Sequence, residues 1–501
     1  MLHLDLIAPV PALLARHHGD RRHQVAYRDA RRAITWGELA GSTARIAGQL
    51  AQAVTADGDR VAIYLPNGVD WVEACLAALR AGAVVVPISF DAAEGEIVYR
   101  LTDAGCRVVI TTAGRLDLIE ELSRQAGIAA TVVTIEGLAT GSAPAPDPAD
   151  IDRPSFIIYT SGTTGRAKGV VLSLRSMLWV AAACWGPICG INSDDVVLSP
   201  LPLFHSYAVN LSVLTVLAIG ASEHILERFS PQDTLDLMLT GRYTVFPGVP
   251  TMFHYLLNKA RDAGIERLGK VGLCISAGAI MPAALNRAFE ERFAVKLLDG
   301  YGITETATMV TMNWPEGGRP MGSCGLPLPG VAVRIVDPKT HDDVPFGTEG
   351  ELIVRGPNLM SGYHNKPAET ASALRNGWYH SGDLARSDPA GFVTITGRLK
   401  ELIIRGGQNI APAEIEEVVV RHPQVLDCAV VGIRHEALGE VPCLFVVARE
   451  GTLDRASLLD HCKTYLSAYK IPDAVHLVTA IPRTGSGKIM RFKLVELLKT
   501  A

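Results

Sequence analysis

The sequence lacks several patterns that would reveal its class at once. Its nine cysteines are scattered, no Cys-x-x-Cys pair occurs, and only Cys184 and Cys189 lie close together, which indicates neither a disulfide framework nor a zinc site. Basic residues are not in excess, since the formal net charge is −5, so nucleic acid is not expected as a partner. We therefore expect a protein of the reducing cytoplasm, in which any phosphate binding is local.

Long apolar runs are missing too. The longest, around residues 177–191 and 211–221, are too short for a membrane span or are broken by Gly186 and Pro187. The apolar N-terminal stretch carries Asp5, two prolines and no basic leader, so a signal peptide is not expected. No internal repeat occurs, and biased composition is confined to a Pro, Ala and Asp spacer at 143–154. An integral membrane segment is not expected.

Length and composition indicate a globular protein of several units. The 501 residues are 48% hydrophobic and 20% charged, and a chain of this length divides into two or more packed units. Short β-branched runs alternate with helical patterns, which is typical of βαβ units: "RVAIYL", "AVVVPI", "RVVITT" and "ATVVTI" beside "VDWVEACLAALRAG". From about 325 to 398, strand-like runs between turns predict a small β subdomain. The remainder predicts a compact α+β domain of roughly a hundred residues.

The stretch "YTSGTTGRAKGV" at 159–170 concentrates hydroxyls and glycines around two cations. Lys168 stands between Ala167 and Gly169, so the spacing and the metal-binding hydroxyl of a Walker loop are both absent. Glycines that let backbone N–H groups approach, hydroxyls that donate and a lysine are nevertheless suited to polyphosphate. A solvated linker is the alternative on composition alone. The residues downstream decide between the two.

Five further motifs follow in order: "PLFHSYAV" (202–209), "DGYGITET" (299–306), "YHSGDLA" (379–385), "GRLKELIIRGGQNI" (397–410) and "PRTGSGKIMR" (482–491). Together with the stretch at 159–170, they resemble the adenylate-forming superfamily, and within it the AMP-forming acyl-CoA synthetases, or fatty acyl-CoA ligases. The match extends over nearly the whole chain. Six motifs in the family's order and spacing are far more specific than any one of them.

The resemblance implies a fold and a reaction. The fold class is α/β: a large N-terminal domain (1–399) of two βα-layered subdomains plus a small β-barrel subdomain, hinged to a small, mobile α+β C-terminal domain (400–501). In such enzymes a carboxylate attacks the α-phosphate of ATP and releases pyrophosphate, and a thiol then displaces AMP from the acyl-adenylate. The implied cofactors are ATP, Mg²⁺ and CoA. Preorganised donors and the metal are expected to supply most of the charge stabilisation.

By similarity, the nucleotide is held by residues from several motifs. Glu305 is expected to bind Mg²⁺, which prefers oxygen ligands, with Thr164 as a second metal ligand, and Thr304 faces the α-phosphate. Tyr301 is expected to stack on adenine. The implied contacts to the β- and γ-phosphates are Thr160, Ser161, Gly162, Thr163, Thr164, Gly165 and Lys168. Those to the base and ribose are Gly278, Ala279, Asp299, Gly300, Tyr301, Gly302, Asp383 and Arg398.

Lys488 is the implied catalytic lysine, which bridges the carboxylate and the α-phosphate as a point charge. A lysine in a Gly-rich loop is otherwise a solvated surface charge. In the superfamily the C-terminal domain then rotates about a hinge, here at Lys400, and presents "IIRGGQNI", where Gly406 and Gly407 let pantetheine pass. The implied catalytic set is Lys488, Glu305, Thr304, His205 and Lys168.

Three positions depart from related groups. Ala167 replaces the proline commonly found before the loop lysine, which predicts a more mobile loop. His205 stands where amino-acid-activating domains carry an aspartate, so α-amino acids are disfavoured. By resemblance it is the aromatic gate between the acyl tunnel and the CoA channel, although a lone histidine is more often a packed core residue. By resemblance, malonyl-CoA synthetases have an arginine at the position that Gly300 occupies in this chain.

The segments expected to line the acyl pocket are "HSYAVNLSVL", "TVFPGVPTMF" and "CISAGAIMP". They are apolar apart from Asn210, Ser276 and small hydroxyls, and no Arg or Lys occurs in them to meet a second carboxylate. A hydrophobic monocarboxylic acid is therefore predicted: a medium or long fatty acid, or an alicyclic or aryl acid. The implied substrate residues are His205, Asn210, Gly248, Val249, Ser276, Ala277, Gly278 and Gly302.

Two alternatives stay open. An acyl-AMP ligase would load the phosphopantetheine of a carrier protein, but the inserted segment typical of that group is not found after the β subdomain. A nucleotide-binding pseudoenzyme would keep the ATP pocket without turnover, against which Glu305, Lys400 and Lys488 argue. The expected partners are a small carboxylic acid, ATP, and CoA or a carrier protein, with a homodimer left open.

Overall fold

Residues 2–53, 58–140, 143–160, 167–406, 408–449, 452–484 and 487–500 are described by a computed structural model of the chain. Most of the predicted phosphate-binding stretch and one predicted pantetheine residue lie outside these ranges: Ser161, Gly162, Thr163, Thr164, Gly165 and Gly407. The other candidate residues lie within them.

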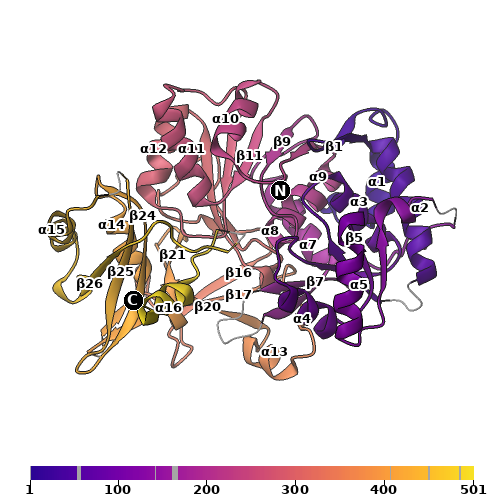
Figure 1. Cartoon of the computed structure of the whole chain (residues 1–501). Coiled ribbons are helices and arrows are strands. Elements are labelled where there is room, and N and C mark those ends of the chain that lie inside the picture. The colour runs from indigo at the N-terminus through magenta and orange to yellow at the C-terminus, as the bar shows by residue number, and fades with distance from the viewer. Residues whose placement is uncertain are drawn as a thin grey trace.

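One sheet follows the βα pattern of the N-terminal sequence (Figure 1). Its β-branched runs become parallel neighbours because buried strands of this kind are joined by helices that cover the sheet. The hairpin β7–β8 extends it, with Thr160 at the end of β7 paired with Lys168 at the start of β8. In spatial order the strands are β18 (Gly362–Tyr363), β8 (Lys168–Ser173), β7 (Pro154–Thr160), β4 (Val84–Pro87), β3 (Arg60–Tyr64), β5 (Cys106–Thr111) and β6 (Thr131–Thr134).

A second sheet carries the "DGYGITET" motif at the end of one strand. Strands β9 to β13 pair in parallel, so the carboxyl ends of β11, β12 and β13 meet at one edge, where ligands bind in open α/β sheets. In spatial order the strands are β15 (Leu326–Pro327), β14 (Thr311–Met312), β13 (Lys296–Tyr301), β12 (Leu273–Ser276), β11 (Val245–Gly248), β9 (Val196–Ser199), β10 (Ser222–Ile225), β1 (Val25–Arg28) and β2 (Ala33–Thr35).

Helices cover both sheets. The predicted helix "VDWVEACLAALR" is α3, and two π-helical segments, Ala181–Trp185 and Val209–Thr215, lie in the core between the sheets. Among the described residues, no helix combines the length and apolar character needed to cross a bilayer. The helices are α1 (Val10–His17), α2 (Trp36–Ala53), α3 (Val69–Arg80), α4 (Glu94–Ala104), α5 (Leu116–Gln125), α6 (Ile135–Leu138), α7 (Leu174–Val180), α8 (Ser206–Ala208), α9 (Val216–Ile219), α10 (Pro231–Leu239), α11 (Pro250–Asp262), α12 (Ala283–Phe293) and α13 (Pro367–Ala373).

The small β subdomain is an antiparallel sheet, and the chain after it forms a unit with its own cores. The former contains β16 (Ala332–Val336), β17 (Gly350–Arg355), β20 (Trp378–Ser387), β19 (Leu374–Arg375) and β21 (Val393–Arg398). The latter contains β23 (Gln408–Ile410), β22 (Ile403–Arg405), β25 (Gly439–Ala448), β24 (Val425–His435), β26 (Ala474–Leu477), α14 (Pro412–Val419), α15 (Arg455–Tyr465) and α16 (Arg491–Thr500). This C-terminal unit lies beside α11 and α12 (Figure 1). The predicted fold class is confirmed.

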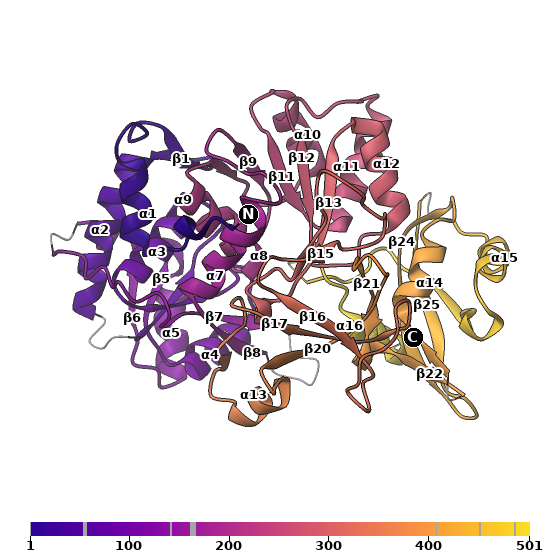
Figure 2. The same cartoon turned by 180° about the vertical axis from the view of Figure 1, so that it is seen from behind.

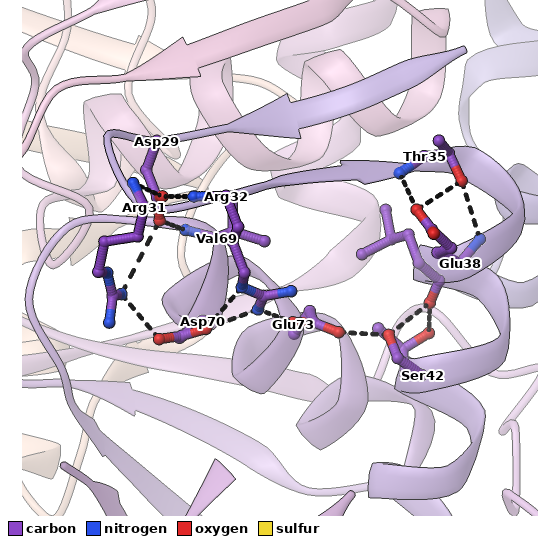
Figure 3. Close-up of polar contacts among 11 residues, drawn as sticks. Asp29, Arg31, Arg32, Thr35, Glu38, Ser42, Val69, Asp70 and Glu73 are labelled. Carbon is purple, nitrogen blue, oxygen red and sulfur yellow. Dashed lines mark hydrogen bonds and ion pairs between the residues drawn. The ribbon is translucent and has the colours of Figure 1, made fainter. Parts of the chain in front are cut away.

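Charged residues fasten the N-terminal strands to α3 (Figure 3). Asp70 accepts from Arg31 at 2.7 Å and from Arg32 at 2.6 Å, and Arg32 also contacts Glu73, which accepts from Ser42. The sequence offers no pattern that predicts this network, because its members come from a turn and two helices.

The Pro, Ala and Asp spacer is held against the first α/β unit. At the end of α3, Arg80 binds Asp147 of the spacer through both carboxylate oxygens, at 2.7 and 2.9 Å, and its carbonyl accepts from the Asp147 N–H. The spacer carbonyl of Ala143 lies so close to Gly48 that a Cβ there would stand 1.8 Å from it. The spacer is therefore a packed segment, although its composition resembles a linker.

Candidate active site

The sheet edge formed by β11, β12 and β13 positions the predicted base and acyl contacts. Gly248 is paired with Ser276, and Ser276 with Asp299, across adjacent strands. The Ser276 hydroxyl and Asp299 Oδ1 are buried without a hydrogen-bond partner, and burial raises the pKa of the Asp299 carboxyl well above its usual range. Buried polar atoms normally form hydrogen bonds. These two unpaired atoms are therefore consistent with a site that binds a polar ligand, such as the edge of a nucleotide base.

The "ITET" residues form a single 3₁₀ turn, Thr304–Thr306, directly after β13. The hydroxyl of Thr304 lies 3.1 Å from that of Ser206, which brings the "PLFHSYAV" motif beside the turn. The turn is followed by Ala307 and Thr308, whose φ angles of 50° and 104° lie in the left-handed region. Such residues cost about 1–3 kcal/mol each and cluster at functional sites.

Tyr363 joins the predicted metal ligand to the predicted phosphate lysine. Its hydroxyl donates to Glu305 Oε1 over 3.0 Å, and the Lys168 ammonium lies 4.9 Å from the centre of its ring. Burial, and then the Glu305 carboxylate, raise the pKa of Tyr363, which keeps the phenol protonated as a donor. A carboxylate that accepts one hydrogen bond retains lone pairs for Mg²⁺, so Glu305 fits a hard cation.

Sequence reasoning missed Tyr363. It lies on β18, which pairs with β8 so that Tyr363 stands opposite Val170. The signal in the sequence is weak, a Gly-Tyr pair shortly before Pro367 that belongs to none of the six motifs. Only the pairing of two distant strands reveals its position.

The predicted ribose contacts lie together across β20 and β21. Asp383 and Arg398 are paired in register, and Arg398 Nε lies 2.8 Å from Asp383 Oδ1. Tyr301 donates its hydroxyl to Asp383 Oδ2 at 2.5 Å. The structure thus brings the tyrosine of the "DGYGITET" motif onto the aspartate of the "YHSGDLA" motif, 82 residues further along the chain.

Lys488 lies at the junction of the two domains. Burial, and then the Arg398 charge, lower the pKa of its ammonium, while the Asp383 and Glu305 carboxylates oppose that shift. The preceding residue, Gly487, lies against Val249, where a Cβ would stand 3.0 Å from a valine methyl. The lysine loop therefore reaches a residue predicted to line the acyl pocket.

Hydrogen bonds close the lysine loop on itself. The Thr484 N–H donates to the Lys488 carbonyl at 2.8 Å, and the Lys488 N–H donates to the Thr484 hydroxyl at 3.1 Å. Arg483 donates to the Gly487 carbonyl at 3.0 Å and binds Asp427 at 2.8 Å. These bonds hold the loop to the C-terminal sheet.

His205 caps the short helix α8, where its Nδ1 accepts from the Tyr207 N–H at 3.4 Å. Burial, and then the nearby Lys488 charge, lower the pKa of His205 to about 3. A neutral ring of this kind is compatible with the predicted aromatic gate and does not act as a cation near neutral pH.

Asn210, another predicted substrate residue, is fully buried on a π-helical segment. Its amide donates to the carbonyls of Met177 and Ala307 at 2.8 and 3.2 Å, and its oxygen accepts from Trp185 at 2.7 Å. These bonds link three segments of the core and use both amide hydrogens. The contact of Asn210 with the acid stays a prediction.

The ends of the phosphate-binding stretch face each other across the β7–β8 hairpin. Thr160 is paired with Lys168, and its hydroxyl lies 3.5 Å from the Lys168 carbonyl. The carbonyl of Ala167 accepts from the Tyr99 hydroxyl at 2.7 Å. This bond anchors the position at which the related sequences carry proline, although the loop itself lies outside the described residues.

The predicted hinge residue follows a predicted ribose contact, Arg398, by two positions. Lys400 is exposed on a 3₁₀ turn, Leu399–Glu401, between β21 and β22. Gly406 has a φ of 56° at the turn after β22 and donates to the Leu438 carbonyl at 2.7 Å. Figure 2 shows β22 on the outer side of the C-terminal unit, far from β13.

The chain is similar to many known enzymes over its whole length. The profile described as AMP-binding enzyme matches residues 14–364, and that of the AMP-binding enzyme C-terminal domain matches residues 414–488. A feruloyl-CoA synthase of an Amycolatopsis species is 35% identical over 94% of this chain and 95% of its own length. The sulfoacetate–CoA ligase of Cupriavidus necator is 34% identical over 98% of both chains.

Solved structures agree with this. ATP-bound MatB from Rhodopseudomonas palustris has a TM-score of 0.90 at 33% identity, over 98% of this chain and 99% of that one. The anthranilate CoA ligase AuaEII in complex with anthranoyl-AMP has a TM-score of 0.91 at 25% identity, over 99% of both. The apo structure of the same MatB has a TM-score of 0.79.

Proposed function

The chain belongs to the AMP-binding enzymes and is an acyl-CoA ligase that works through an acyl-adenylate, and on this premise we propose that it activates a hydrophobic monocarboxylic acid with Mg²⁺ and ATP. One observation carries the catalytic part of the proposal. Gly487, directly before Lys488 in the C-terminal unit, lies against Val249 of the N-terminal unit, so the lysine stands at the boundary between the two units. A cation at that point is suited to oxygens of two different molecules.

In the first half-reaction, each residue contacts a different part of ATP or of the acid. Thr160 and Lys168 hold the departing phosphates, while Thr304 donates to the α-phosphate. Glu305 holds Mg²⁺, which when bound neutralises charge on the pyrophosphate. Lys488 donates to the carboxylate and the α-phosphate together, where negative charge concentrates in the transition state. Asp383 and Arg398 fix the ribose, and Tyr301 the base.

In the second half-reaction, we propose that the C-terminal domain, residues 400–501, turns about Lys400 and presents Gly406 and Gly407 to the pantetheine of CoA. One observation supports the movement. Ile404, beside the glycine turn, is 52% exposed. A large exposed side chain on that face fits a surface that is covered in a second arrangement.

The nature of the acid follows from the proposed pocket wall. Val249 and Ala277 are buried at the sheet edge, and Tyr207 stacks on Trp185 with ring centres 6.1 Å apart and planes at 25°. At position 300, a Cβ would stand 2.4 Å from the Met309 methyl, so methionine side chains fill the space that a longer residue would need. An apolar, uncharged wall favours a fatty, alicyclic or aryl acid over a dicarboxylate.

The test is a product analysis joined to one pair of variants. The enzyme is incubated with ATP, Mg²⁺, CoA and a panel of acids, and mass spectrometry identifies acyl-AMP and acyl-CoA. Apolar monocarboxylates should react at least tenfold faster than malonate, sulfoacetate or amino acids. A preference for any of the latter would overturn the acid class, and acyl-AMP without acyl-CoA would favour a carrier protein as acceptor.

Lys488→Ala tests the role of the lysine. It should depress pyrophosphate release strongly but leave the conversion of preformed acyl-AMP to acyl-CoA within a few-fold. Lys493→Ala, an exposed lysine five residues further on, is the matched control and should change neither step. Equal loss of both steps in Lys488→Ala would contradict the two-conformation mechanism.

A further inference from the structure

Two histidines and a glutamate gather on the small antiparallel sheet, outside the predicted nucleotide contacts. Glu351 on β17 and His380 on the neighbouring β20 have side chains that are 6% and 9% exposed. His341, on the exposed loop after β16, lies with its ring centre 5.3 Å from that of His380. One ligand atom from each of the three lies within 4.8 Å of the others. The strand pairing assembles the cluster from residues that are far apart in the sequence.

The distance between the ligand atoms of Glu351 and His380 is close to the distance between two ligand atoms bound to the same metal ion. Glu351 Oε2 and His380 Nδ1 lie 3.1 Å apart, whereas two ligands of a tetrahedral zinc, with bonds of about 2.0–2.1 Å, are about 3.3 Å apart. A dication can therefore take the place of the proton that the pair shares, and the proton is released to solvent. His341 completes the set by turning its exposed side chain inward by about 1.5 Å.

The surroundings orient the glutamate, as expected for a metal ligand. Its other oxygen, Oε1, accepts from the Gly382 N–H at 3.0 Å, and such outer contacts fix the direction of a ligating carboxylate. Arg375 opposes a cation, because its guanidinium lies 3.3 Å from His341 Nε2. This arginine is exposed, so it can turn into solvent when a dication binds.

We propose that His341, Glu351 and His380 form a site for a divalent first-row transition metal, with Zn²⁺ as the preferred ion. Two imidazole nitrogens and one carboxylate oxygen suit zinc and leave the fourth position to water on the exposed side. The site shares no residue with the proposed Mg²⁺ site at Glu305. Its two imidazole nitrogens also disfavour Mg²⁺, which prefers oxygen ligands. The cysteine pattern in the sequence indicates no zinc site, and this cluster contains no cysteine.

The experiment uses the full-length protein without a histidine tag, treated with a chelator and then titrated with Zn²⁺ in a calorimeter without nucleotide. We expect about one equivalent to bind to the wild type, and Co²⁺ in the same protein to give the intense visible absorption of a tetrahedral site. His341→Ala should weaken binding by about 100-fold or more. His341 is exposed, so the variant should keep the fold, which a circular dichroism spectrum checks.

Three further variants sharpen the result. His23→Ala removes another exposed histidine and should bind like the wild type, as should Glu305→Gln, which alters the proposed Mg²⁺ site. Arg375→Gln should tighten binding several-fold, because it removes the opposing charge. Absence of stoichiometric Zn²⁺ binding to the wild type, or unchanged binding in His341→Ala, would overturn the proposal.

Discussion

Tyr363 donates its hydroxyl to Glu305 across 3.0 Å while the Lys168 ammonium lies over its ring. A single aromatic side chain therefore contacts a carboxylate proposed to hold Mg²⁺ and a lysine proposed to hold the phosphates of ATP. These two charges arise from different sheets and different motifs. Tyr363 fixes their relative position before the nucleotide binds.

Tyr363→Phe should remove the hydrogen bond and keep the ring under Lys168. A hydrogen bond to a charged group contributes about 1.5–3 kcal/mol, so the Mg²⁺ concentration for half-maximal adenylation should rise about tenfold or more. Pyrophosphate release measured across a Mg²⁺ titration checks this. Tyr465→Phe, an exposed tyrosine, is the control. An unchanged Mg²⁺ dependence would mean that Tyr363 serves the packing of β18 alone.

Asp383→Asn should weaken ATP binding without unfolding the sheet. The amide cannot replace the charged partner that Arg398 has at 2.8 Å, and loss of a charge-assisted bond costs about 2 kcal/mol. We expect the KM for ATP to rise about 30-fold, with a smaller change in the KM for the acid. Steady-state kinetics with each substrate varied in turn separates the two. An equal rise in both KM values would argue against a ribose contact.

Gly302→Ala should be severe, although it adds only one methyl group. The added Cβ would stand 1.6 Å from the backbone oxygen of Thr308, which a side-chain movement cannot relieve. Overpacking against backbone should cost about 3 kcal/mol or more, measured by urea unfolding, and adenylation should fall with it. Gly318→Ala, where a Cβ meets nothing within 4 Å, is the matched control and should be near neutral.

Glu223 makes stability depend on pH. Its side chain is buried on β10 with both carboxyl oxygens lacking hydrogen bonds. Burial raises its pKa well above the ordinary 4.5, despite the hydroxyls of Ser212 and Ser199 nearby. Above pH 4.5 the unfolded chain releases a proton that the folded chain retains, so the free energy of unfolding falls as pH rises through that region.

Glu223→Gln should remove this slope. The variant should match the wild type near pH 4.5 and exceed its free energy of unfolding by about 1–3 kcal/mol at pH 8. Urea unfolding at several pH values measures the difference, and Glu316→Gln, an exposed glutamate, is the control. A gap that does not grow with pH would contradict a proton held by Glu223.

Local patterns in the sequence predicted several strands and a helix correctly. The runs of β-branched residues became β3 to β6, and the helix before "AGAVVV" became α3 with its first residue, Val69, as the pattern indicates. The motifs also selected Tyr301 and Asp383, which the structure joins by a hydrogen bond of 2.5 Å, and their roles toward the nucleotide stay predictions. The strands and the helix could be predicted because each signal is contained within a few neighbouring residues.

Long-range pairing explains what the sequence could not reveal. Tyr363 reaches Glu305 only because β18 pairs with β8. The spacer at 143–154 reads as a linker, yet the bidentate contact of Arg80 with Asp147 holds it. The cluster of His341, Glu351 and His380 likewise arises from strand register. Composition and spacing do not specify which distant segments become neighbours.

The contact of Gly487 with Val249 limits which residue can occupy position 487 when the C-terminal unit lies against the N-terminal unit. Gly487 has a φ of 81°, and even a methyl group there would press on the valine at 3.0 Å. A side chain at position 487 would require the valine to shift by a few tenths of an ångström and would strain the left-handed backbone, so it would hinder the approach of the lysine loop to the N-terminal unit. Val249 is also predicted to line the acyl pocket, so the position of the C-terminal unit and the proposed acid site depend on the same side chain.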